Sequence, residues 1–128
     1  MLNIDGDQIS IAIDLDQGAR LASVQWRDMQ FAVPFRGQDL SWGWFSMVPF
    51  AGRIKDGIIK DSKGNKHQLP NNFDPPHALI GYGAHSSWED IGGGRQFLEL
   101  PSPFDVATVT QSYEILDNAL RWSLDHKK

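Results

Sequence analysis

The sequence contains no cysteine, so disulfide bonds and thiolate chemistry are excluded. Any metal site would therefore need histidine and carboxylate ligands. His67, His77 and His85 are too widely spaced for a recognisable zinc motif, and we expect no metal. The glycines of Gly81–Gly83 and Gly92–Gly94 do not precede a predicted helix, so neither forms a phosphate-binding loop. No cofactor is predicted.

Basic charge is also scarce, and the formal net charge is -4. A chain without a basic face is not expected to bind nucleic acid, because it cannot replace the counterions of the phosphates. No apolar run approaches the roughly 18 residues that a membrane-spanning helix needs, so no membrane partner is expected. The first residues carry Asp5 and no basic region, which is unlike a secretory signal and favours a cytoplasmic location.

The residues that are abundant indicate one folded domain over residues 1–128. The chain is 41% apolar and 22% charged, as is ordinary for a globular protein. Five Trp and seven Phe supply large units of surface to bury, at about 150–250 Å² each. A single domain with its own core is therefore feasible at this length.

Alternating apolar residues predict an all-β fold, an antiparallel β-sandwich without long helices. Asp56-Gly57 and Lys63–Lys66 are predicted hairpin turns. Nothing follows the last predicted strand to cover its edge, so we expect a homodimer or a complementary chain at that edge. The predicted strands are Ile9–Leu15, Arg20–Trp26, Met29–Val33, Ile58–Lys60, Trp88–Ile91, Gln96–Leu100, Val106–Ile115 and Leu120–Leu124.

The stretch from Phe45 to Gly83 holds the most distinctive motifs. Phe45–Ile54 reads FSMVPFAGRI, and Leu69-Pro70-x-Asn72 and His77-Ala78-Leu79-x-Gly81 follow it. Taken in order, these motifs resemble the aldose 1-epimerase (galactose mutarotase) family. The resemblance continues at Gly18–Leu21, Trp88, Pro101–Phe104 and Tyr113–Ile115.

The resemblance implies a part of a galactose mutarotase-like β-supersandwich, an isomerase fold of carbohydrate metabolism. It implies an open cleft for a hexose, in which a Glu and a His interconvert the anomers. The match is to the N-terminal half only, because in the family the catalytic Glu, the acid His and a binding Asp belong to the second half. Ile80 stands where the family has a sugar-contacting His. We therefore expect weak sugar binding with impaired catalysis. An active mutarotase completed by a partner chain or dimer, and a non-catalytic β interaction module, are the alternatives.

Two residues of this stretch could carry the chemistry. The Arg53 guanidinium presents five donors in a planar fork and could hold sugar hydroxyls; alternatively it could pair with Asp56 or a backbone carbonyl. His77 is the one candidate for a proton carrier. Because it follows Asp74-Pro75-Pro76, it could instead fix its loop by hydrogen bonds.

Three more residues are predicted to contact a sugar. His85 could project into the same cleft, or be an ordinary loop histidine. Trp44 and Tyr82 could offer aromatic faces to the C–H patches of a pyranose, although core packing is the alternative for both. Trp88 and Trp122 are assigned to the core.

Overall fold

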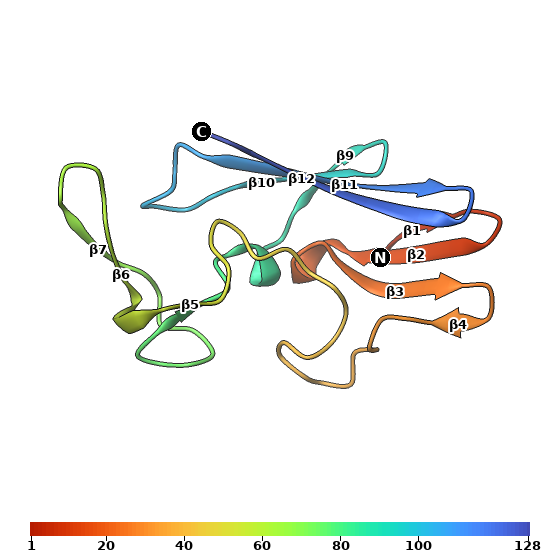
Figure 1. Ribbon diagram of the computed structural model, residues 1–128, viewed down its shortest axis with the longest axis horizontal. Coiled ribbons are helices and arrows are strands. Elements are labelled where there is room, and N and C mark those ends of the chain that lie inside the picture. The colour runs from red at the N-terminus through yellow and green to blue at the C-terminus, as the bar shows by residue number, and fades with distance from the viewer.

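The computed structural model covers residues 1–128 and consists of two antiparallel four-stranded sheets, packed face to face with a looped middle segment at one end (Figure 1). The predicted all-β sandwich is confirmed. The first sheet contains, in order, β1 (Leu2–Asp5), β2 (Ile9–Asp14), β3 (Arg20–Trp26) and β4 (Met29–Gln30). The second contains β12 (Ala119–Lys127), β11 (Thr108–Leu116), β10 (Arg95–Glu99) and β9 (Glu89–Gly92).

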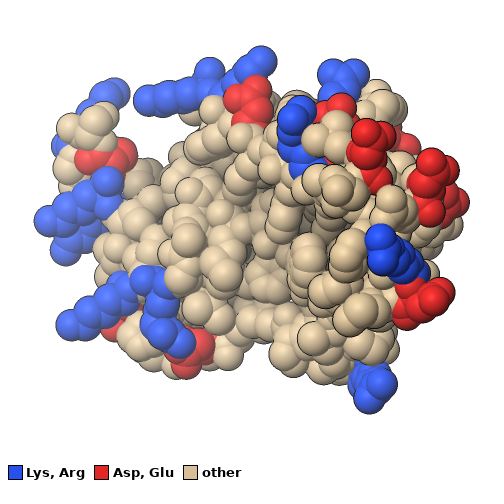
Figure 2. Space-filling model, turned by 45° about the vertical axis from the view of Figure 1, so that its right-hand side comes forward, with Lys and Arg blue, Asp and Glu red and all other residues tan.

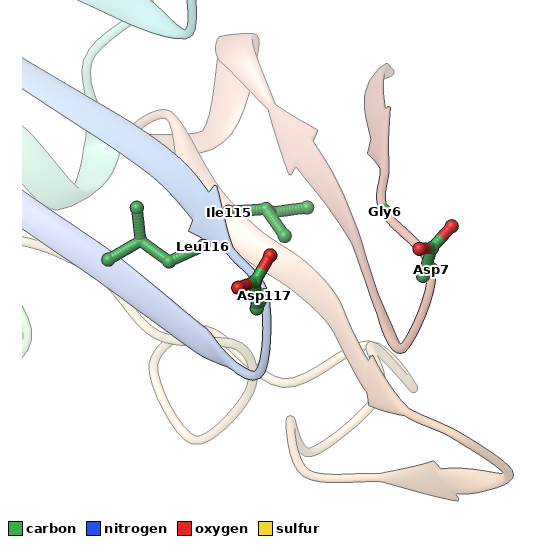
Figure 3. A pocket seen from close by; sticks show the side chains of 5 residues that line it. All are labelled: Gly6, Asp7, Ile115, Leu116 and Asp117. Carbon is green, nitrogen blue, oxygen red and sulfur yellow. The ribbon is translucent and has the colours of Figure 1, made fainter.

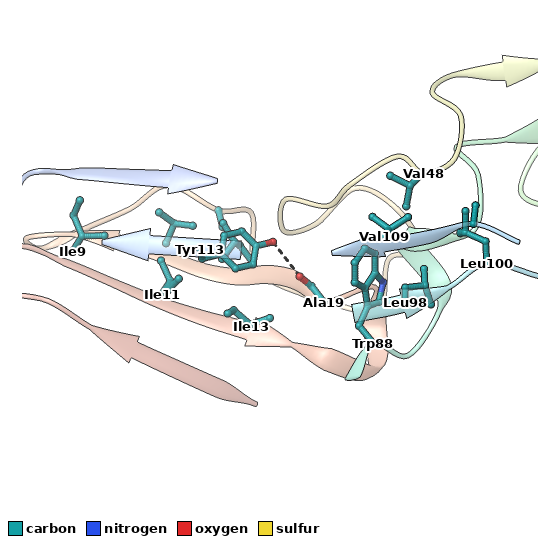
Figure 4. Packing of buried hydrophobic residues seen from close by; sticks show 14 residues of the cluster. Ile9, Ile11, Ile13, Ala19, Val48, Trp88, Leu98, Leu100, Val109 and Tyr113 are labelled. Carbon is teal, nitrogen blue, oxygen red and sulfur yellow. Dashed lines mark hydrogen bonds between the residues drawn. The ribbon is translucent and has the colours of Figure 1, made fainter. Parts of the chain in front are cut away.

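The core lies between the two sheets, where the alternation of the strands places the apolar side chains. Ile9, Ile11 and Ile13 of β2 are buried on the side of the core that holds Tyr113 of β11, while Val109 of β11 lies further along, beside Trp88 and Leu98 (Figure 4). The Tyr113 hydroxyl donates a hydrogen bond of 3.1 Å to the carbonyl oxygen of Ala19 and so ties the two sheets together. The period-two pattern read from the sequence therefore describes the inner faces correctly.

The middle segment, from residue 31 to residue 88, forms only short strands. β5 (Arg53–Ile54) pairs with β8 (Ala78–Leu79), and β6 (Ile58–Lys60) pairs with β7 (Lys66–Gln68). The β6–β7 hairpin projects away from the sandwich (Figure 1). Short 3₁₀ turns, η1 (Leu15–Gln17), η2 (Lys55–Gly57) and η3 (Gly83–His85), complete the elements.

Gly81 anchors this segment to the preceding apolar run. Its φ is +69°, and a Cβ at this position would lie 2.1 Å from the Val48 carbonyl oxygen. The same oxygen accepts hydrogen bonds from the backbone N–H groups of Tyr82 (2.7 Å) and Gly83 (3.1 Å). Only glycine allows so close an approach in this conformation, and the close approach holds the two motif-bearing segments together.

Several predicted boundaries change in the structure. Asp56-Gly57 is not a hairpin turn, because it belongs to η2 and the strands on either side of it pair elsewhere. Of Met29–Val33, only the first two residues form a strand, and β1 was not predicted at all. The Lys63–Lys66 turn is confirmed as the end of the β6–β7 hairpin.

The two tryptophans assigned to the core differ from each other. Trp88 is buried, as predicted. Trp122 is 37% exposed, because it lies on β12 at the edge of its sheet, where the first sheet no longer covers it. β12 is the outermost strand of the second sheet, and no strand pairs with its other side.

Charged side chains lie around the margin of the face in Figure 2, while its hollowed centre is formed by uncharged residues. The structure contains no helix long and apolar enough to cross a membrane.

Candidate functional site

Arg53 lies on β5 opposite Leu79 of β8, at the base of the loop that carries Asp74. Its Nε donates a hydrogen bond of 2.6 Å to Asp74 Oδ2, and both side chains are about half exposed. The ion-pair partner is therefore Asp74 and not Asp56. The pair uses one edge of the guanidinium, so the terminal amino groups are left for a ligand.

His77 is fixed by a backbone group. Its Nδ1 accepts a hydrogen bond of 3.0 Å from the Asp56 backbone N–H, which leaves the ring proton of the neutral imidazole on Nε2. The contact ties the His77 ring to the backbone of η2.

His85 ends η3 and is held by Asn72. The Asn72 side chain pairs with the backbone of Leu79 in both directions, accepting from its N–H (2.7 Å) and donating to its carbonyl oxygen (3.0 Å). Its amide nitrogen also lies 3.2 Å from His85 Nε2, which makes that ring nitrogen the acceptor and places the proton on Nδ1. Phe73 packs edge-on against the imidazole, with ring centroids 5.5 Å apart.

A pocket of about 270 Å³ opens beside His85. Three aromatic rings, from Phe35, Trp42 and Phe73, line its walls, and the Trp42 and Phe35 rings are in contact at 4.8 Å. The polar groups at the pocket are those of Gln17, Arg20, Gln38, Asp39 and His85. Aromatic walls with a few polar groups are typical of small-molecule sites.

Arg20 lines this pocket and is almost completely buried. Its guanidinium donates to three backbone carbonyl oxygens, those of Gln17 (2.8 Å), Trp42 (3.1 Å) and Ala84 (2.9 Å). Burial lowers the pKa of Arg20 below its ordinary value, and the charge of Asp14 opposes this shift. Because each of its three nitrogens already donates to a backbone carbonyl oxygen, we assign Arg20 to shaping the pocket and not to binding the ligand.

Trp44 and Tyr82 lie away from this pocket. Trp44 is 39% exposed and lines an apolar groove at the edge of the sandwich. Tyr82 is buried edge-on against Phe104, its hydroxyl has no hydrogen-bond partner, and burial raises its pKa. Their aromatic faces are thus used for packing and for the groove.

The segment Asn72–Asp74 contacts three of the five predicted site residues. Asn72 contacts His85, the Asp74 carboxylate binds Arg53, and the Asp74 carbonyl oxygen accepts a hydrogen bond of 3.0 Å from the His77 backbone N–H. Phe73, between them, lines the pocket. Sequence reasoning noted Asn72 only as part of a motif and missed the pocket residues Phe35, Phe73 and Asp39. No local signal marks these three, since they come together only through the folding of two long loops.

A second recess, of about 500 Å³, lies between the ends of two hairpins (Figure 3). Its lining is Gly6, Asp7, Ile115, Leu116 and Asp117, with the two carboxylates at the turns. Carboxylates only accept hydrogen bonds, and no aromatic ring lines this recess. It is a weaker candidate than the aromatic pocket. No group of three or more His, Asp or Glu side chains is placed to hold a metal ion.

Comparison with known proteins establishes the class of the fold. No protein-family model and no curated protein matches the chain. Among solved structures, it is similar to the crystal structure of a "putative aldose 1-epimerase" from Escherichia coli K12, with a TM-score of 0.79 and 22% sequence identity. The match covers 97% of this chain and 44% of the Escherichia coli chain.

The chain is thus an all-β sandwich with the fold of part of an aldose 1-epimerase-like protein. It spans less than half the length of the structure that it matches. The resemblance predicted from the sequence motifs is confirmed at the level of the fold.

Proposed function

We propose that this chain binds a hexose-type sugar in the pocket between Trp42 and His85, as an aldose 1-epimerase-related protein of carbohydrate metabolism. The pocket itself carries the proposal, because aromatic walls and a polar rim meet in a volume of about 270 Å³. This volume lies just below the roughly 300–1,000 Å³ of typical ligand pockets, which suits a small ligand. The fold likeness to the Escherichia coli protein supports the same class of ligand.

The pyranose would place its apolar C–H face against Phe73 and Phe35, above the buried Trp42 ring. Its hydroxyls would donate to the Asp39 carboxylate and accept from His85 Nδ1–H. Gln38 contributes less, because its amide nitrogen already donates to the carbonyl oxygens of two loop residues.

Arg53 and His77 stay proposed sugar contacts at the far side of the Asn72–Asp74 segment. Asp74 orients the Arg53 guanidinium, and the terminal amino groups could bind vicinal hydroxyls. The backbone hydrogen bond of His77 leaves its Nε2–H as a donor.

We propose that the 128 residues bind the sugar without interconverting its anomers. Mutarotation needs a base and an acid with tuned proton affinities on the two sides of the anomeric centre, each giving about 10²–10⁴-fold. The titratable side chains lining the pocket other than Arg20 are Asp39 and His85, and both are exposed to water. Further polypeptide would have to supply the acid and the base.

Saturation-transfer NMR with glucose and galactose tests binding. We expect a signal that Phe73→Ala and His85→Ala abolish and Arg53→Ala weakens. The matched controls are Phe31→Ala, of similar exposure to Phe73, His67→Ala and Arg95→Ala. A signal that the pocket variants leave unchanged, or no signal at high sugar concentration, would contradict the proposal.

An active mutarotase is the second candidate, because Asp39 and His85 line one pocket. NMR exchange between α- and β-anomers tests it. We expect the exchange rate at high protein concentration to equal the rate in buffer alone. If the protein accelerates exchange and both Asp39→Asn and His85→Ala remove the acceleration, the chain is a catalyst, with these two residues as its base and acid.

A further inference from the structure

β12 forms a long free edge of the second sheet. All nine of its residues, Ala119–Lys127, pair with β11 in an unbroken register, and no strand pairs with its other side. No proline, glycine or bulge interrupts it. Natural sheets usually protect such edges with short strands, prolines or bulges, and an unprotected edge pairs with another strand.

An apolar groove of about 400 Å³ opens beside this edge, where both sheets end. Every residue that lines it is apolar: Ile9, Val24, Trp26, Phe31, Trp44, Leu120 and Trp122. Leu124, on the same face of β12 as Leu120 and Trp122, is 49% exposed. Exposed apolar surface of this kind marks an interaction site.

We propose that the occupant is a second copy of this chain, whose β12 pairs antiparallel with this β12 about a two-fold axis at Ser123. In this register Arg121 lies opposite the partner's Asp125, and Trp122 lies opposite the partner's Leu124. Each pair occurs twice because of the symmetry. Two opposite-charge pairs and two aromatic–aliphatic pairs thus flank the axis.

The charges of β12 select this register over its neighbours. Side chains directly opposite in an antiparallel pair project to the same face, so a two-fold axis can lie only at a residue and its copy. An axis at Trp122 would place Arg121 opposite Ser123, without a charge partner. An axis at Leu124 would place Arg121 opposite Lys127, and like charges directly opposite are destabilising.

The same axis joins the two apolar grooves. Because it is perpendicular to the sheet, the inner faces of both copies lie on one side of a continuous sheet of twice four strands. Trp122, which packs against Tyr113 at 5.5 Å, then meets apolar surface of the other copy. On the outer face Arg121 already contacts Glu114 at 3.3 Å, so the new pair extends this contact into a charge ladder.

Charge exchange between two variants tests the register. Asp125→Arg makes the centre of β12 wholly basic, and Arg121→Asp makes it wholly acidic. Light scattering with size exclusion should show a wild-type dimer at micromolar concentration and a monomer for each variant alone. Mixing the two variants should restore a dimer that contains one copy of each, measured by native mass spectrometry. Circular dichroism checks that each variant is folded.

Disulfide trapping gives an independent measurement. The chain has no cysteine, so Ser123→Cys introduces a single thiol at the axis. Opposite Cα atoms lie about 4.5–5.5 Å apart in such a pair, within the range of a disulfide. Ser112 faces the same side one strand further from the axis in each copy, which adds about 4.8 Å twice. Ser112→Cys is therefore the matched control and should not cross-link.

A wild-type chain that is monomeric at all concentrations overturns the proposal. The proposal is also overturned if a different β-rich polypeptide, and not a second copy, occupies the edge. A dimer that both charge variants leave intact, or equal trapping of Ser123→Cys and Ser112→Cys, also overturns it.

Discussion

The guanidinium carbon of Arg20 lies 4.2 Å from the centre of the Trp42 ring, and both of these stacked side chains line the proposed sugar pocket. The Phe45 ring covers the guanidinium at 4.8 Å. Through its three carbonyl contacts, Arg20 connects η1, the tryptophan loop and η3. A single buried cation therefore holds together the three loops that surround the pocket.

Arg20→Met is expected to destabilise the protein by about 3 kcal/mol, because three carbonyl oxygens lose a charged donor. Urea unfolding followed by tryptophan fluorescence measures the loss. Arg95→Met is the control: its side chain is exposed and makes one long contact with Gly92, so the expected change is within about 0.5 kcal/mol. Equal effects of the two substitutions would contradict the role given to Arg20.

Two buried tyrosines should respond differently to loss of their hydroxyl. Tyr113→Phe removes the bond to Ala19 and should cost about 1 kcal/mol. The Tyr82 hydroxyl is buried without a partner, so Tyr82→Phe should cost nothing and could gain up to about 1 kcal/mol. Thermal unfolding of the two variants compares them directly. A larger loss for Tyr82→Phe would show that this hydroxyl has a partner.

The same tyrosines predict a loss of stability in alkali. Burial raises the pKa of both above the ordinary value of 10.0. At a pH between the unfolded and the folded pKa, a tyrosine has lost its proton in the unfolded chain but keeps it in the folded chain. The free energy of unfolding therefore falls as pH rises from about 10. The double variant Tyr82→Phe/Tyr113→Phe should show a shallower fall than the wild type. Parallel curves for the two proteins would refute this expectation.

Gly81→Ala should be strongly destabilising, by about 3 kcal/mol or more, because the new Cβ would strike the Val48 carbonyl at a positive φ. Gly92→Ala separates the steric clash from the cost of the positive φ. Gly92 has a φ of +83°, but nothing lies within 4 Å of a Cβ built there, so only the conformational cost of about 1–2 kcal/mol remains. Chemical denaturation of both variants gives the difference. Similar losses would mean that the clash relaxes freely.

The sequence predicted the parts of the fold that depend on local pattern. β2, β10 and β11 follow from alternating side chains, and the β6–β7 turn follows from its glycine. The pairing of β5 with β8 was not predictable, because each has two residues and a long loop separates them.

The site was predicted only in part, for a related reason. Residue type marked Arg53, His77 and His85 as polar candidates in loops. The direction of an aromatic side chain depends on tertiary packing, so Trp44 and Tyr82 were indistinguishable from Phe73 in the sequence. Phe73 also has a φ of +40°, a conformation that is uncommon for a bulky residue and that no local motif indicates.

The projecting β6–β7 hairpin offers a place to lengthen the chain. Its tip is closed by Asp61, whose carboxylate accepts hydrogen bonds from the backbone N–H groups of Lys63 and Asn65, both at 2.9 Å. A Cβ at Gly64, which lies between them, would have no neighbour within 4 Å. A peptide tag or fluorophore inserted after Gly64 would extend into water, away from the sandwich core (Figure 1). The hairpin thus provides an attachment point for immobilising or labelling the protein while its pocket stays accessible.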